Sequence, residues 1–168
     1  MAAQIIDGEA IAESLKIGLK AEVEELKKSN KQPHLRAVQL GENAASQLYV
    51  RNQQRTCEEI GITYALDELP IETTESQLLA HIHKLNNDQS VTGVILQMPL
   101  PAGINAGKIQ TQIAPEKDVE GMNPANMGAI VYGKYKMGPC TAMAAIELIK
   151  SLGIEIKGMN AVVVGRSA

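Results

Sequence analysis

The chain has 168 residues, of which 45% are hydrophobic and 21% charged, a composition that suits one domain with a sizeable core. It contains four Tyr, no Phe and no Trp, and its net charge is −3. It therefore offers neither the aromatic platforms nor the basic face that nucleic-acid binding requires. We expect small molecules as ligands and no nucleic-acid partner.

The two cysteines and the N-terminal segment narrow the class further. Cys57 and Cys140 lie far apart and form no CxxC pair, so neither a disulfide framework nor a structural zinc site is expected. The first residues, MAAQIIDGEAIAESLK, lack the order of a signal peptide, and no apolar run reaches the ~18 residues of a membrane span. These features predict a cytoplasmic protein without membrane association.

Helical and strand patterns alternate along the chain. The predicted helices cover residues 9–28, 44–61, about 74–87, 105–113 and 141–152, and the predicted strands cover residues 34–40, 62–69, 91–97 and 161–165. The first helix is amphipathic, with an apolar face formed by Ile11, Leu15, Leu19, Val23 and Leu26. In the second helix, Leu48, Cys57 and Ile60 are expected to point inward. Thr73 or Thr74 can cap the third.

Three irregular segments interrupt the later part of the chain. They are rich in Pro, Gly and Asn and read QMPLP (97–101), PEKDVEGMNPANMG (115–128) and MGPCT (137–141). In an open parallel sheet, segments that follow the ends of buried strands form the ligand crevice. The final apolar run AVVVG (161–165) fits two interpretations equally: the first strand of a dinucleotide-binding unit, or a last strand of the first sheet.

Taken together, several segments resemble the bifunctional methylenetetrahydrofolate dehydrogenase/methenyltetrahydrofolate cyclohydrolase family. They are SQLYVRNQQRTCEEIGI (46–62), GVILQMPLP (93–101), PEKDVEGMNPANMG (115–128), GPCT (138–141) and VVVGRS (162–167). The resemblance covers essentially the whole chain, and its QxPLP and KDVxG segments are specific. It implies an α/β fold: a three-layer αβα catalytic domain with a parallel sheet, followed by the first strand of a Rossmann-type domain.

The same resemblance implies domain limits and an activity. Residues 1–140 would form the folate-binding catalytic domain, 141–157 an inter-domain helix and 158–168 the start of an NAD(P)-binding domain. The implied reactions are NADP-dependent oxidation of 5,10-methylenetetrahydrofolate and hydrolysis of the methenyl product to 10-formyltetrahydrofolate. Tetrahydrofolate would lie in the cleft, and a homodimer is expected. The residues leave open whether NAD or NADP is used.

The resemblance gives Tyr49, Gln53 and Gln97 catalytic roles. Tyr49 matches a tyrosine that stacks over the substrate, and the i, i+4 spacing places residue 53 on the same helix face. There the family has a proton-handling lysine, whereas this chain has Gln53, whose amide neither gains nor loses a proton near neutral pH. Gln97 matches a glutamine that orients the lysine and contacts the substrate. We therefore expect impaired hydrolysis.

Other residues match substrate-binding positions of the family. They are Pro99, Leu100, Asp118, Glu120 and Pro139, in addition to Tyr49 and Gln97. Glu120 replaces the aspartate of KDVDG; it keeps the charge that binds the pterin but is one methylene longer.

The resemblance also implies cofactor-binding residues, namely Thr141, Gly165, Arg166 and Ser167. Thr141 is in addition a candidate helix N-cap. Cys140 is expected to pack rather than act as a nucleophile. His34, His81 and His83 are assigned no role, and no metal ligands are expected.

Two alternatives to the leading hypothesis stay open. A non-catalytic folate-binding or regulatory paralogue is favoured by Gln53, Glu120, Ala142 and Ala144, which all depart from the family pattern. A two-domain dehydrogenase acting on amino acids is disfavoured by the KDVEG and QMPLP segments.

Overall fold

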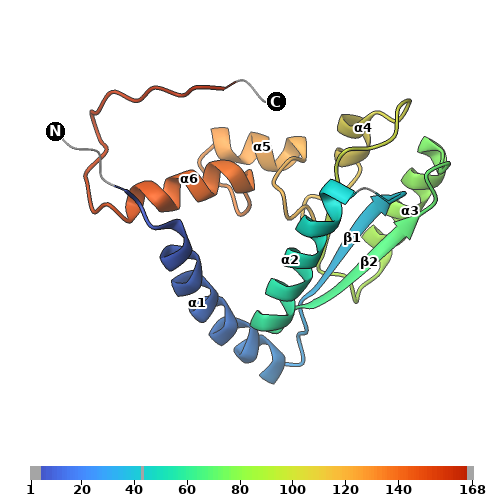
Figure 1. The fold of residues 1–168 in the computed structure, drawn as a ribbon, viewed down its shortest axis with the longest axis horizontal. Coiled ribbons are helices and arrows are strands. Elements are labelled where there is room, and N and C mark those ends of the chain that lie inside the picture. The colour runs from blue at the N-terminus through green and yellow to red at the C-terminus, as the bar shows by residue number, and fades with distance from the viewer. Residues whose placement is uncertain (1–4, 43, 166–168) are drawn as a thin grey trace.

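The computed structural model describes residues 5–42 and 44–165. Its centre is a parallel three-stranded sheet of order β2-β1-β3, with β1 at His34–Leu40, β2 at Thr63–Leu69 and β3 at Gly93–Leu96 (Figure 1). The three strands were predicted, with ends within two residues of those observed. All four residues of β3 are buried, as expected for a strand covered on both faces.

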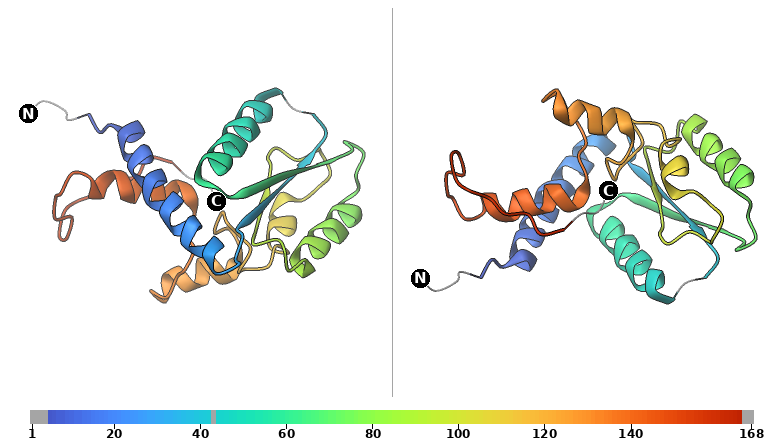
Figure 2. Two further views of the ribbon diagram at one scale, coloured as in Figure 1. Left: turned by 90° about the horizontal axis from the view of Figure 1, so that it is seen from below. Right: turned by 90° about the horizontal axis from the view of Figure 1, so that it is seen from above.

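Helices cover both faces of the sheet, which confirms the predicted three-layer αβα arrangement. α2 (Ala44–Ile60) lies against one face, and α3 (Glu75–Asn87) and the short α4 (Ala106–Gln110) lie against the other (Figure 2). The main apolar core lies between the sheet, α3 and α4, and its buried members are Val38, Leu40, Leu78, Ile82, Leu85, Val91, Val94, Leu96, Ile109 and Ile113.

Helix α3 begins as its sequence predicts. The Thr74 side chain accepts a hydrogen bond from the backbone N–H of Gln77, and the Gln77 side chain accepts one from the N–H of Thr74. This reciprocal capping box satisfies two donors that a helix start would otherwise leave unpaired.

Helix α1 (Gly8–Lys28) is amphipathic as predicted, but most of its apolar face is not covered. Val23 is 4% exposed, whereas Leu15, Leu19 and Leu26 are 40–48% exposed. The helix extends away from the sheet and makes a V with α2 (Figure 1). In α2, Cys57 and Ile60 are buried as expected, but Leu48 is 60% exposed, so its inward placement was wrong.

Two helices follow the sheet, and both correct the sequence interpretation. α5 (Pro124–Val131) lies in a segment expected to be irregular; Asn123 caps it and Pro124 occupies its first turn. α6 (Cys140–Lys150) begins before Thr141, with Pro139 at the N-cap and no side-chain capping bond. Thr141 is therefore not the N-cap, because the helical backbone already includes Cys140.

The predicted strand at 161–165 is not formed in the described structure. The segment has no strand pairing there, and Val162, Val163 and Val164 are 89–95% exposed. A β-strand requires hydrogen bonds from a neighbouring strand, and none of the described strands lies beside these residues. Among the described helices, none is long and apolar enough to cross a membrane.

Candidate functional site

Two small pockets adjoin at the carboxyl end of β3 and the inner side of α2. The first, of about 260 Å³, is lined by Ser46, Tyr49, Ile95, Leu96, Gln97, Met98 and Glu120. The second, of about 300 Å³, is lined by Tyr49, Asn52, Gln53, Thr56 and Cys57. Tyr49 belongs to both. The carboxyl ends of parallel strands are where α/β proteins place their ligands, so this pair of pockets is the candidate site.

The helix side of the site is built from α2. Tyr49 and Gln53 lie one turn apart, as their spacing predicts, and Tyr49 is 59% exposed. The Oε1 atom of Gln53 accepts hydrogen bonds from Gln97 Nε2 at 3.0 Å and from the Tyr64 hydroxyl at 3.2 Å. Gln97 is only 5% exposed, and its backbone N–H donates to the carbonyl of Val38. The structure thus brings Tyr49, Gln53 and Gln97 together.

Tyr64, on β2, was not singled out from the sequence. Burial raises the pKa of its phenol to about 12, and nearby Cys57 and Tyr49 act in the same direction. The hydroxyl therefore stays protonated, and able to donate, throughout the neutral pH range. No motif marks this residue; its position follows from the way β2 pairs with β1, Tyr64 lying opposite Leu35.

The loop side of the site is residues 117–121, the KDVEG segment. The Nζ of Lys117 donates to the carbonyls of Leu85, Asn86 and Asp88 at 2.7–2.9 Å, at the C-terminal end of α3. The backbone of this loop also joins the sheet, since the N–H of Val94 donates to the carbonyl of Lys117. Lys117 is a structural anchor rather than a ligand-facing group.

Asp118 is 4% exposed, and its carboxylate is used for hydrogen bonds within its own loop. Its carboxylate accepts hydrogen bonds from the backbone N–H groups of Glu120 and Asn123 and from the Asn126 side chain. Asp118 lies beneath the pocket and shapes the turn that presents Glu120. A direct contact between Asp118 and a substrate stays a prediction.

Glu120 lines the first pocket opposite Tyr49. Burial raises the pKa of its carboxyl group, the negative charge of Asp118 raises it further, and the N–H of Leu96 opposes both by donating to it. A carboxyl group in this setting gains from a ligand that brings hydrogen-bond donors, because those donors stabilise its charged form.

The end of the loop is packed against the start of α6. Gly121 has a φ of 68°, and a Cβ there would lie 2.4 Å from the backbone carbon of Gly138. The Sγ of Cys140 lies 3.2 Å from the carbonyl oxygen of Val119, and burial raises the pKa of that thiol. A raised pKa disfavours the nucleophilic thiolate, whereas the packing role expected for Cys140 stays a prediction because the residue is exposed.

Besides Asp118, three predicted substrate-binding residues do not line these two pockets. Leu100 packs against the apolar core, Pro99 follows Met98 through a cis peptide bond, and Pro139 abuts Gly121. Their contacts are with the protein itself, so their binding roles stay predictions.

The two predicted cofactor-binding residues that the structure describes also line neither pocket. Thr141 is exposed on α6, and Gly165 is exposed in the unpaired segment. Arg166 and Ser167 lie outside the described residues. The binding roles of these four residues stay predictions as well.

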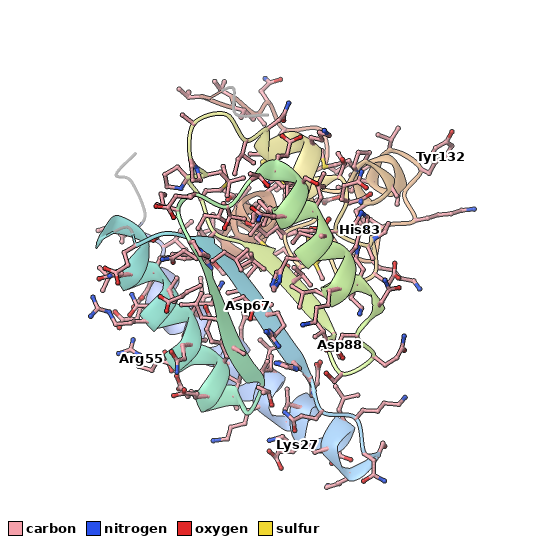
Figure 3. All side chains as sticks on the ribbon, turned by 90° about the vertical axis from the view of Figure 1, so that its right-hand side faces the viewer. Lys27, Arg55, Asp67, His83, Asp88 and Tyr132 are labelled. Carbon is pink, nitrogen blue, oxygen red and sulfur yellow. The ribbon has the colours of Figure 1, made fainter. Side chains whose placement is uncertain are left out.

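One other polar cluster is an alternative candidate for a site. Asp67, on β2 (Figure 3), forms an ion pair with Arg36 of β1, and its Oδ2 lies 2.8 Å from the Nε2 of His81 on α3. His81 therefore has a hydrogen-bond partner that the sequence did not reveal. Among the residues that the structure describes, no group of three or more His, Cys, Asp or Glu is arranged to hold a metal.

A larger pocket of about 700 Å³ lies near the amino ends of the strands. Its lining residues include Leu26, Lys31, His34 and Thr92. It lies at the end of the sheet where β1 begins, opposite to the end where parallel sheets present ligands, and it contains none of the motif residues.

Comparison with known proteins decides the family. Residues 6–120 match the model of the tetrahydrofolate dehydrogenase/cyclohydrolase catalytic domain, a span that includes Tyr49, Gln53, Gln97 and Glu120. The chain belongs to this family.

Relatives of this family match nearly the whole chain. The bifunctional protein FolD of Moorella thermoacetica is 45% identical over 167 residues, covering 99% of this chain and 60% of that protein. The solved structure of the bifunctional FolD enzyme of Campylobacter jejuni superposes with a TM-score of 0.95 at 36% identity, covering 99% of this chain and 59% of that one. The chain thus spans about three fifths of these relatives.

A third relative was solved with ligands. The methylenetetrahydrofolate dehydrogenase-cyclohydrolase of Trypanosoma brucei, in complex with NADP cofactor and an inhibitor, gives a TM-score of 0.86 at 31% identity and covers 94% of this chain and 55% of its own. The α/β fold with a parallel sheet that was predicted from the resemblance is therefore confirmed, apart from the strand at 161–165.

Proposed function

We propose that this chain is the folate-binding part of an enzyme of one-carbon metabolism. The proposed reactions are NADP-dependent oxidation of 5,10-methylenetetrahydrofolate to the methenyl form and hydrolysis of that product to 10-formyltetrahydrofolate, the second slowed by Gln53. The observation that carries the proposal is the meeting of Tyr49, Gln53, Gln97 and Glu120 at one edge of the sheet. The names of the family and of its relatives support the folate chemistry.

The two sides of the site suit the flat face and the polar edge of a pterin. The exposed ring of Tyr49 provides a flat apolar surface on which an aromatic heterocycle can stack. Glu120, at the other side of the first pocket, provides a carboxylate that accepts the amino and ring N–H groups of a pterin. Binding by a stack on one side and a charged pair of acceptors on the other fixes both the position and the orientation of the ring.

Gln53 limits the chemistry of the hydrolysis step. An amide can hold a water or a carbonyl group by hydrogen bonding, but it cannot donate and recover a proton as an amine does. Arg55 lies on the outer side of α2 (Figure 3) and is a poor proton carrier because a guanidinium stays protonated. Loss of general acid–base catalysis lowers rates by ~10²–10⁴.

Restoring the amine tests this proposal. We expect Gln53→Lys to hydrolyse 5,10-methenyltetrahydrofolate ~10²-fold or more faster than the unchanged chain, as measured by the decay of methenyl absorbance. Gln54→Lys is the matched control, because Gln54 is exposed on the adjacent helix face. Equal rates for the chain and Gln53→Lys would contradict the assignment of impaired hydrolysis to this residue.

A second candidate is a folate-binding paralogue without catalysis. Gln53 favours it, as does Glu120 in the place of an aspartate. An assay for NADP reduction with methylenetetrahydrofolate separates the two candidates, because only an enzyme would couple folate oxidation to NADP reduction.

The described residues do not by themselves form an NADP site. Thr141 and Gly165 are both exposed, lie in separate segments and line neither pocket of the candidate site. The hydride-transfer step therefore needs groups other than these, and NADP is proposed from the family. A homodimer and a cytoplasmic location also stay predictions from the resemblance.

A further inference from the structure

The carbonyl oxygen of Gln53 is fully used inside the protein. An amide oxygen has two lone pairs, and here one accepts from Gln97 Nε2 at 3.0 Å and the other from the Tyr64 hydroxyl at 3.2 Å. With both acceptor positions filled, the N–H₂ end of the amide is the end that Gln53 can offer to a ligand. Gln53 also lines the pocket that it shares with Tyr49, so the residue borders a space where a ligand can lie.

The two donors reach Gln53 from opposite edges of the sheet. Tyr64 lies near the start of β2, and Gln97 follows the end of β3, with β1 between them. Strand register places Tyr64 on the same face of the sheet as Leu35, its partner in β1, and the fully buried Ala37. The contact therefore depends on the tertiary arrangement of three elements, not on local spacing.

Tyr64 remains a donor under the conditions in which the chain would work. Its phenol has a pKa raised to about 12, chiefly by burial, so it does not ionise near neutral pH. A protonated phenol can turn its hydrogen toward the Gln53 oxygen, and that preference opposes rotation of the amide by half a turn. Gln97 alone would supply only one of the two bonds that fix this orientation.

We propose that Tyr64 is a positioning residue which, with Gln97, holds the Gln53 amide so that its N–H₂ group faces the folate. Gln53 then serves as a fixed hydrogen-bond donor to a carbonyl oxygen of the ligand, in place of a group that exchanges protons. The ligand part of this inference rests on the proposed folate function. The orientation of the amide does not, and it can be measured without any ligand.

The first experiment measures the amide directly. In nuclear magnetic resonance spectra of the ligand-free chain, we expect Tyr64→Phe to shift or broaden the side-chain amide protons of Gln53, because the ring is kept and only the donor is lost. Tyr132→Phe is the matched control, since Tyr132 is 82% exposed and projects from the end of α5 (Figure 3). Gln53 amide signals that are the same in the chain and in Tyr64→Phe would overturn the proposal.

The second experiment asks whether Tyr64 acts through Gln53. With 5-formyltetrahydrofolate as the calorimetric probe, we expect Tyr64→Phe to weaken binding by about 3- to 10-fold, the usual net value of one hydrogen bond. In a Gln53→Met background the same substitution should have no further effect, because there is no amide left to orient. An equal loss in both backgrounds would show a structural role only and would overturn the proposal.

The design separates the possible failures. If the unchanged chain does not bind the probe, the proposed folate function fails, and with it the ligand half of this inference, while the resonance experiment still decides the orientation of Gln53. If the chain binds and Tyr64→Phe binds equally well, only the positioning role fails. Should Tyr64→Phe lower the unfolding midpoint appreciably, Tyr64→Met repeats both measurements with another apolar side chain.

Discussion

The two sides of the candidate site are held by different kinds of contact. On the loop side, Lys117 and Asp118 are buried and bonded mainly to backbone groups of α3 and of the loop itself. On the helix side, Tyr49 is more than half exposed and Gln53 is held by bonds between side chains. Buried bonds to the backbone fix the shape of the chain, whereas exposed side chains remain free to contact a ligand.

The contrast indicates which property a substitution on each side should change. Changes on the loop side should lower the free energy of unfolding, because they leave backbone groups unpaired in the interior. Changes on the helix side should alter ligand binding or rate with little effect on folding. The KDVEG motif thus combines a structural part, Lys117 and Asp118, with a ligand-facing part, Glu120.

The largest loss of stability is expected from Lys117→Met. It removes three hydrogen bonds from a buried ammonium to the carbonyls that end α3 and should lower the free energy of unfolding by about 4 kcal/mol. Urea denaturation measures this, with the exposed Lys134→Met as control. A loss equal to that of Lys134→Met would show that the loop is not anchored in this way.

Gly121→Ala should lower the free energy of unfolding slightly less than Lys117→Met does. Its φ of 68° disfavours a side chain, and the new Cβ would meet the Gly138 backbone, so we expect a loss of about 3 kcal/mol. Gly133→Ala separates the two causes, because Gly133 has a φ of 66° but, apart from Gly133 and its two chain neighbours, no described residue has an atom within 4 Å of where its Cβ would be. Gly133→Ala should lose only about 1 kcal/mol in the same denaturation experiment. Similar losses in both variants would exclude the close contact as the cause.

The smallest effect is a pH-dependent one at Glu120. Because its pKa is raised in the folded chain, the folded state prefers the neutral carboxyl, and stability falls as pH rises through that pKa. Glu120→Gln, which stays neutral, should therefore be more stable than the unchanged chain at pH 7, and the gain should vanish in acid. Unfolding midpoints across this pH range test it, with the exposed Glu116→Gln as control; a gain that persists in acid would refute the explanation.

Most of the fold could be predicted because its signals are local. The spacing of apolar residues and the cap at Thr74 predict α3, and a continuous run of apolar residues predicts the buried strand β3. Helix α5 was missed although Asn123 and Pro124 carry an N-cap and first-turn signal, because the segment was interpreted through its Pro and Asn content. The strand at 161–165 failed for a different reason, since strand formation depends on neighbours that a local pattern does not reveal.

Family motifs mark several residues of the candidate site in the sequence, whereas contacts made only by the tertiary structure carry no such mark. Tyr49, Gln53, Gln97 and Glu120 carry recognisable positions, and the structure brings them to one place. Tyr64 belongs to no motif, and its contact with Gln53 follows from the register of β2 in the sheet and the packing of α2 beside it. Similarly, the KDVEG motif does not predict the hydrogen bonds that Asp118 accepts within its own loop.

A calorimetric titration of this chain with 5-formyltetrahydrofolate tests the proposed folate site without any assumption about catalysis. We expect saturable binding of one ligand per chain, weakened about 10-fold by Tyr49→Ala through loss of ring stacking, with no loss in Tyr135→Ala, an exposed tyrosine outside the site. No binding, or binding that Tyr49→Ala leaves unchanged, would contradict the assignment of the pocket between Tyr49 and Glu120 as a folate site.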